Sequence, residues 1–116
     1  MNWLSIDTDN TLLEISALSA EERVLILKYS PACSISIITR LLLEREWNDG
    51  MMNMKTYLLN VLVHRNLSDK IEAQYKIKHE TPQALIIEND KCIAHFNHGK
   101  VIFSELKKFA NCLVSS

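Results

Sequence analysis

The segment RVLILKYSPACSISIITRLLLERE, residues 23–46, contains the transition that decides the fold. It begins with four consecutive apolar residues, Val24 to Leu27, which are typical of a strand buried on both faces of a sheet. A polar turn with one cysteine, Cys33, follows, and apolar residues then recur at helical spacing. Because a thiol at a strand-to-helix turn can be exposed and activated, we interpret Cys33 as the catalytic residue.

The composition indicates one globular domain over residues 1–116, with 47 % hydrophobic and 23 % charged residues. No apolar run approaches the roughly 18 residues that a membrane helix needs, and the N-terminus does not resemble a secretory signal. A net charge of -1 without a basic block argues against a nucleic-acid partner. We therefore expect a cytoplasmic protein with neither membrane nor nucleic acid as a partner.

The cysteines argue against a disulfide framework and against a metal site. Their number is odd, and Cys33, Cys92 and Cys112 are widely separated. No C-x2-C or H-x3-H pair is present, so we expect no bound metal. Only two glycines, Gly50 and Gly99, occur, which excludes glycine-rich phosphate loops.

The rest of the pattern predicts alternating helices and strands. After a short apolar start at residues 3–6, Asp7 to Asp9 offer N-cap candidates for a first helix. Asn89-Asp90 separates two apolar runs and predicts a tight hairpin. The expected strands after the first are residues 55–63, 85–87 and 92–96, so that the order is a helix followed by β-α-β-α-β-β-α.

Each expected helix has apolar residues at helical spacing, which predict its buried face. These residues are Leu12, Leu13, Ile15 and Leu18 in the first helix, and Ile35, Ile38 and Leu42, widened by Ile37 and Leu41, in the second. They are Leu67, Ile71 and Tyr75 in the third helix, and Phe103, Leu106, Phe109 and Leu113 in the last. The expected helix ends are a left-handed cap at Gly50 and N-caps at Ser68 and Ser104.

The element order predicts the fold class. A helix between the first two strands makes them parallel, whereas a hairpin makes the last two antiparallel. The continuously apolar first strand implies that helices cover both faces of the sheet. A three-layer α/β fold with a central mixed sheet is the thioredoxin-like arrangement, and this identification is an analogy of element order.

The position of Cys33 favours the reactive thiolate form. The first turn of a helix offers unpaired N–H groups and a partial positive charge, and either Ser30 or Cys33 is its N-cap. Lys28 adds a positive charge nearby, and the hydroxyl or N–H of Ser36 can donate to the thiolate from one turn further on. We therefore assign Lys28 and Ser36 to thiolate stabilisation. The alternative is that Cys33 is an ordinary core cysteine.

Serine at position 36 limits the chemistry of the reactive cysteine. A dithiol oxidoreductase would have a second cysteine there, whereas Ser36 cannot form an intramolecular disulfide. An external thiol must therefore resolve any mixed disulfide, unless Cys92 or Cys112 moves close. We interpret both as packed small hydrophobic residues. On its expected strand, Cys92 shares a face with Ala94 and Phe96.

Thr81-Pro82, 49 residues after Cys33, is the second expected element of the site. Proline is normally unfavourable where a central strand begins. A cis Thr81–Pro82 bond would turn the chain and leave the Thr81 main chain to pair with a bound substrate, and we predict this form. The alternative is a trans proline that starts an edge strand.

Three motifs together resemble the YtxJ-like monothiol bacilliredoxins of the bacillithiol system. The usual patterns of this family are close to KHS-x-x-C-P-I-S, Y-R-x-[LI]-S-N-x-I-A and K-H-E-S-P-Q, and the resemblance spans nearly the whole chain. The matching residues are Lys28, Ser30, Cys33, Ile35 and Ser36, then Arg65 and Ser68, then Lys78, His79, Glu80, Pro82 and Gln83, with Thr81 replacing serine and His98 matching a later histidine.

The resemblance implies a thioredoxin fold and removal of bacillithiol from cysteines of oxidised cytoplasmic proteins. Bacillithiol would be a thiol co-substrate, and no cofactor would be bound. The partners would be S-thiolated proteins and a low-molecular-weight thiol. Within this framework we assign Cys33 as catalytic and Ser30, Thr81, Pro82 and His98 to substrate binding.

Three departures from the family pattern leave the identity of the small thiol open. Tyr29 replaces a histidine, Ser34 replaces a proline, and Gly99 replaces an aromatic residue. Two alternatives follow: a glutathione-linked monothiol glutaredoxin-like protein, and a non-catalytic redox-sensing or binding module with the same fold. Glutaredoxins typically have Gly-Gly after the last strand, where this chain reads NHGK. His79 and His98 either act near the site or are ordinary surface histidines.

Overall fold

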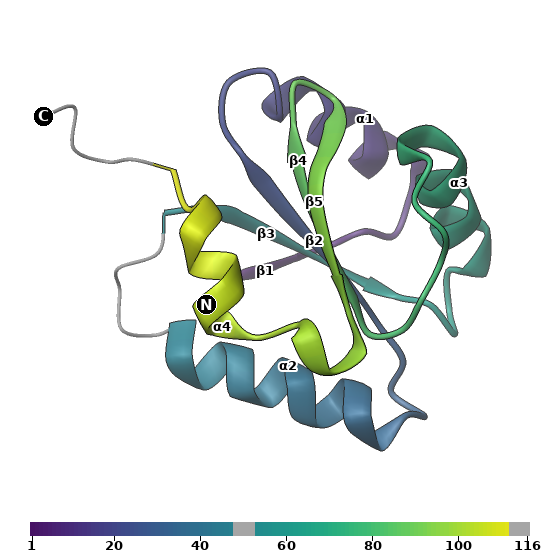
Figure 1. Ribbon diagram of the computed structural model, residues 1–116. Helices are drawn as coiled ribbons and strands as arrows, with labels where there is room; N and C mark the ends of the chain where they lie inside the picture. The colour runs from purple at the N-terminus through teal and green to yellow at the C-terminus, as the bar shows by residue number, and fades with distance from the viewer. Residues whose placement is uncertain (48–52, 112–116) are drawn as a thin grey trace, which may run out of the picture.

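The computed structural model describes residues 1–47 and 53–111, and its elements alternate along the chain (Figure 1). The strands are β1 Trp3–Ser5, β2 Val24–Tyr29, β3 Lys55–Asn60, β4 Gln83–Glu88 and β5 Lys91–Asn97. The helices are α1 Asp9–Leu18, α2 Ser34–Trp47, α3 Arg65–Tyr75 and α4 Phe103–Leu106. Short 3-10 turns at His98–Lys100 and Lys107–Phe109 flank α4.

The five strands form one mixed sheet in the order β1-β3-β2-β4-β5. β3 is parallel to both β1 and β2, whereas β4 is antiparallel to β2 and to β5. These directions confirm the predicted pairing. β1 was not expected, because three residues at a sheet edge are too few for a strand pattern to appear. β2, which leads to the cysteine turn, lies at the centre.

Helices cover both faces of the sheet and confirm the three-layer prediction (Figure 1). α1 and α3 pack on one face through Leu12, Ile15, Leu67, Ile71 and Tyr75. α2 and α4 pack on the other face through Leu43, Trp47 and Leu106. The side chains of β2 alternate between these two cores, as the period of a strand requires. Lys28 therefore shares the α1/α3 face with Val24 and Ile26.

The predicted buried face of α2 is wrong. Its five apolar residues are all exposed: Ile35, Ile37, Ile38, Leu41 and Leu42. The face against the sheet is instead built from Ser36, Thr39, Leu43 and Trp47. Because six of the nine positions from 35 to 43 are apolar, and two of the three polar ones face the sheet, periodicity did not fix the rotation of the helix. The two small hydroxyl residues let its first turns approach the sheet closely.

The outcomes at the other helices are mixed. Thr8, within the predicted cap, is the N-cap of α1 and accepts a hydrogen bond from the Thr11 N–H. Leu13 is exposed, although its neighbours Leu12 and Ile15 are buried. The Leu67–Ile71–Tyr75 face of α3 is confirmed as buried.

The predicted serine caps are wrong at both later helices. His64 is the N-cap of α3, and Ser68 lies fully buried inside that helix. Ile102, rather than Ser104, is the N-cap of α4. The expected cap at Gly50 and the residues Cys112 and Leu113 lie outside the described residues.

The turns follow from local side chains. Asn89 and Asp90 both have positive φ and form the predicted hairpin between β4 and β5. β3 ends earlier than expected, because the Asn60 side chain accepts the N–H groups of Leu62 and Val63 and begins a turn. None of the described helices has the length and apolar character needed to cross a membrane.

Candidate active site

Cys33 lies between β2 and α2, at the N-terminal end of the helix. Its carbonyl accepts a hydrogen bond from the Ile37 N–H at 3.1 Å, which is the first bond of the helical pattern. This contact makes Cys33, rather than Ser30, the N-cap residue. The thiol is partly exposed, and the helix terminus beside it favours a negative charge.

Serine side chains fix the shape of this turn. The Cys33 N–H donates to the Ser30 carbonyl at 3.1 Å, and the Ala32 N–H donates to Ser30 Oγ at 3.2 Å. The Ser30 N–H donates in turn to Ser36 Oγ at 3.2 Å, and Ser36 is fully buried. The Ser36 hydroxyl oxygen therefore accepts a hydrogen bond from the main chain. Donation from this hydroxyl to the Cys33 thiolate stays a prediction.

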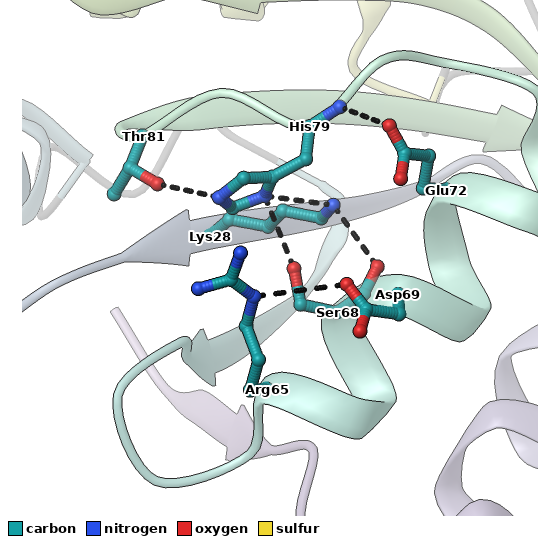
Figure 2. Close-up of polar contacts among 7 residues, drawn as sticks. All are labelled: Lys28, Arg65, Ser68, Asp69, Glu72, His79 and Thr81. Atoms are coloured by element: carbon teal, nitrogen blue, oxygen red, sulfur yellow. Dashed lines mark hydrogen bonds and ion pairs between the residues drawn. The ribbon is translucent and has the colours of Figure 1, made fainter.

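Lys28 is fully buried and points into the α3 side of the sheet (Figure 2). Its Nζ lies 3.3 Å from the Ser68 carbonyl and 3.4 Å from His79 Nδ1. Burial lowers the pKa of Lys28 to about 8, against the opposing effect of Glu72 and Asp69, so the amine carries its proton at pH 7. The hydrogen-bond partners of Lys28 are thus Ser68 of α3 and His79 of the loop before β4. An effect of Lys28 on the Cys33 thiolate stays a prediction.

His79 connects Lys28 with the loop before β4. Its Nδ1 lies 3.1 Å from Ser68 Oγ, its Nε2 lies 3.2 Å from Thr81 Oγ1, and its main-chain N–H donates to Glu72 at 2.8 Å. Burial lowers the pKa of His79, and so does the positive charge of Lys28, which keeps the imidazole neutral at pH 7. Figure 2 shows the ring between the Lys28 ammonium and the Thr81 hydroxyl.

The Thr81–Pro82 peptide bond is cis, as the sequence predicts. The Pro82 carbonyl accepts the His98 N–H at 2.8 Å, and His98 Nε2 lies 2.9 Å from a Glu80 carboxylate oxygen. The Gln83 side chain donates to the Lys78 carbonyl at 2.8 Å. The loop is therefore held by contacts on both sides of the proline, and His98 belongs to this part of the molecule.

Comparison with known proteins identifies the family. The model of the family Monothiol bacilliredoxin BrxC matches residues 4–106. The chain belongs to the monothiol bacilliredoxin family. A comparison with curated protein sequences found no significant match. The family and the fold together indicate a thiol redox function, with a low-molecular-weight thiol as a reaction partner.

Solved structures support the fold of this bacilliredoxin. A candidate oxidoreductase with a thioredoxin fold is 26 % identical, with a TM-score of 0.78 and 90 % of each chain covered. Schistosoma mansoni thioredoxin is 13 % identical, with a TM-score of 0.71 and coverage of 94 % of this chain and 99 % of that one. Fasciola hepatica thioredoxin is 10 % identical, with a TM-score of 0.70 and coverage of 90 % and 92 %. At these identities the two thioredoxins show the fold alone.

Cys92 lies in β5, and the prediction that it shares a face with Ala94 and Phe96 is wrong. A register shift between Ile86 and Ile87 places Cys92 on the α1/α3 side, whereas Ala94 and Phe96 pack on the α2/α4 side. Its Sγ donates to the Ala94 carbonyl at 3.2 Å, and burial raises the pKa of the thiol. These contacts agree with a packing role.

The contribution of α3 to the site was missed by sequence reasoning. Ser68 was expected at a helix start, whereas Ser68 and Glu72 both contact His79 from within α3. One signal was available: Lys28 shares the strand periodicity of Val24 and Ile26, which predicts a buried lysine that needs polar partners. Among the described residues no cluster of three or more His, Cys, Asp or Glu side chains is arranged to hold a metal ion.

Tyr29 occupies the position where the family pattern has histidine. It packs against the α2/α4 core, and the Arg40 guanidinium lies 5.0 Å from the centre of its ring. Arg40 is also paired with Glu44 at 2.9 Å. The imidazole of the family pattern is thus replaced by a phenol ring that packs beneath a cation.

Proposed function

We propose that this bacilliredoxin removes bacillithiol from S-bacillithiolated cytoplasmic proteins by monothiol exchange. The observation that carries the proposal is the single cysteine at the start of α2, with serine one helical turn later, in a chain of this family. A thiol at a helix N-terminus suits nucleophilic attack on a disulfide. A serine at position 36 leaves the product for another molecule to resolve.

The exchange has two balanced steps. The Cys33 thiolate attacks the bacillithiol sulfur of the substrate disulfide, the substrate cysteine leaves as a thiolate, and a Cys33–bacillithiol disulfide forms. A second thiolate from outside the protein then attacks the bacillithiol sulfur, forms a disulfide with it and releases the Cys33 thiolate. The oxidising equivalent passes to that external thiol, and each leaving thiolate takes up a proton from water when its pKa requires it.

The second part of the proposal concerns substrate binding. The Thr81 main chain before the cis Pro82 would pair with the polypeptide of the mixed disulfide. Ser30 and His98 would contact the substrate from the two sides of the site. The contacts that support these roles are the Ser30 hydrogen bonds in the cysteine turn and the bond from the His98 N–H to the Pro82 carbonyl. Lys28 and Ser36 would favour the thiolate.

Intact mass spectrometry tests the function. The reduced protein is mixed with a bacillithiolated or a glutathionylated model protein, and both components are followed with time. We expect transfer of one bacillithiol to Cys33, no transfer to Cys33→Ser, and unchanged transfer to the matched control Cys92→Ser. Equal slow release with the wild type and Cys33→Ser would contradict enzymatic exchange.

The same experiment separates the alternatives. Transfer from the glutathionylated protein alone would favour a glutaredoxin-like activity. Stable modification of Cys33 that excess bacillithiol does not reverse would favour a redox-sensing module. Addition of a second thiol should restore the unmodified mass if turnover depends on an external resolving thiol.

A further inference from the structure

The hydrogen bonds around His79 have a direction that Lys28 determines. Two groups lie within hydrogen-bond distance of His79 Nδ1: Lys28 Nζ at 3.4 Å and Ser68 Oγ at 3.1 Å. An ammonium group has three donors and no acceptor. When Lys28 is charged, Nδ1 must therefore carry a lone pair, and the ring proton must lie on Nε2.

This tautomer defines the role of the Thr81 hydroxyl. Nε2 is 3.2 Å from Thr81 Oγ1, so its N–H donates to the hydroxyl oxygen. The hydroxyl proton then points away from His79 and can be donated to another group. Thr81 is partly exposed at the cis peptide bond, so this proton is available to a docked molecule.

Further contacts support this arrangement. The His79 main-chain N–H donates to Glu72 at 2.8 Å, which holds the main chain of the residue that carries the ring. Lys28 also donates to the Ser68 carbonyl at 3.3 Å. Gln83, directly opposite Lys28 in the β2–β4 pairing, is fully buried, and its Oε1 has no hydrogen-bond partner among the described residues. This buried acceptor lies on the same face of the sheet as the Lys28 side chain.

We propose that Lys28 is a positioning residue that acts through His79 and makes the Thr81 hydroxyl a hydrogen-bond donor to an acceptor oxygen of the docked mixed-disulfide substrate. The chain of donors runs from Lys28 Nζ to His79 Nδ1, from His79 Nε2 to Thr81 Oγ1, and from Thr81 to the substrate. The docking step rests on the proposed function, whereas the tautomer of His79 does not.

The wild-type protein is tested first by NMR, without any substrate. Long-range proton–nitrogen correlations of the His79 ring at pH 7 should show a protonated Nε2 and an unprotonated Nδ1. In Lys28→Met, Nδ1 is free to donate to Ser68 Oγ, and the Nδ1–H form should become populated. Ser68→Ala should keep the wild-type tautomer, because the ammonium remains. A wild-type Nδ1–H form, or an unchanged tautomer in Lys28→Met, would overturn the inference.

Kinetics with a bacillithiolated model protein test the docking step. Thr81→Val should raise KM about 5- to 10-fold, as expected for one lost hydrogen bond, with kcat changed less than about twofold. Thr81→Ser should restore the wild-type KM, because it keeps the hydroxyl. Lys28→Met should raise KM similarly, and the double variant should be no worse than either single one. Lys107→Met, an exposed lysine, is the charge control.

The outcomes separate this inference from the proposed function. Absence of wild-type turnover with both bacillithiolated and glutathionylated proteins would contradict the proposed function, and the NMR result would still decide the Lys28–His79 relation. A lower kcat with an unchanged KM in Lys28→Met would show that Lys28 acts only on the thiolate, as proposed above, and it would overturn the positioning role. If Lys28→Met does not fold, wild-type NMR and the Thr81 pair still decide the matter.

Discussion

Two thiols in this bacilliredoxin, both partly exposed, have opposite surroundings. Cys33 is the N-cap of α2, where the main-chain N–H groups of the first helical turn favour a negative charge. Cys92 lies in a strand, donates its hydrogen to the Ala94 carbonyl and has a raised pKa because of burial. Exposure alone therefore does not separate a reactive cysteine from a packed one. The hydrogen-bonding groups that each sulfur meets make the difference.

The positions of the two thiols also agree with the proposed monothiol chemistry. Cys92 lies on the α1/α3 side of the sheet, and its hydrogen bond stays within β5. Position 36 is one helical turn from Cys33 and is fully buried as serine. A resolving thiol at position 36 would suit an intramolecular disulfide, whereas the chain has its second described cysteine in a strand that packs on the core.

The largest expected effect comes from Ser36→Cys. Residues three apart in a helical turn have Cβ atoms about 5–6 Å apart, a separation that suits a disulfide after small adjustment. The new thiol should displace bacillithiol from Cys33 and leave an intramolecular disulfide. An effective concentration of about 1 M would shorten the lifetime of the mixed disulfide about 1,000-fold relative to 1 mM external thiol. Intact mass should show loss of the adduct and of two hydrogens.

Ser34→Cys is the matched control for this experiment. It adds a cysteine to the same turn, at an exposed position next to Cys33 in the sequence. Adjacent Cα atoms are only about 3.8 Å apart, which is shorter than a normal disulfide allows. The mixed disulfide should persist in this variant. Persistence in Ser36→Cys as well would show that serine 36 is not what limits the wild type.

The sequence predicted the elements better than their orientation. β2, the hairpin, the cysteine turn and the cis Thr81–Pro82 bond follow from local chemistry, since apolar runs, Asn-Asp and Thr-Pro are short-range signals. The rotation of α2 depends on tertiary packing, because six of its nine positions from 35 to 43 are apolar and the polar Ser36 and Thr39 face the sheet. Periodicity misplaces the buried face where small hydroxyl residues, rather than the apolar ones around them, pack against the sheet.

The support of the site was harder to predict for a related reason. Lys28, Ser68 and Glu72 are close to His79 only after α3 has packed against β2. Their separations in sequence are long, and polar residues in a helix are usually read as its solvent face. A register shift in β5 likewise exchanged the faces around Cys92, which strict alternation does not anticipate.

The second prediction tests the orientation of α2, the helix that begins after Cys33. Leu43 is 1 % exposed and Ile38 is 56 % exposed, although both are branched apolar residues of the same helix. Leu43→Ala should lower the free energy of unfolding by about 3 kcal/mol, because it leaves a cavity. Ile38→Ala should change it by less than about 1 kcal/mol. Urea denaturation measures both, and equal losses would contradict the observed orientation of α2.

The smallest expected effect is a difference in alkylation rate between the two thiols. With Cys112→Ser as the background, iodoacetamide at pH 7 should modify Cys33 at least about 10-fold faster than Cys92. Only the thiolate reacts, and a raised pKa means that Cys92 forms its thiolate at higher pH than an ordinary cysteine. The Cys92 rate should therefore keep rising above pH 9. Peptide mass spectrometry quantifies each site, with urea-unfolded protein as the control in which both rates converge. Equal rates in the folded protein at pH 7 would remove the distinction between the two thiols.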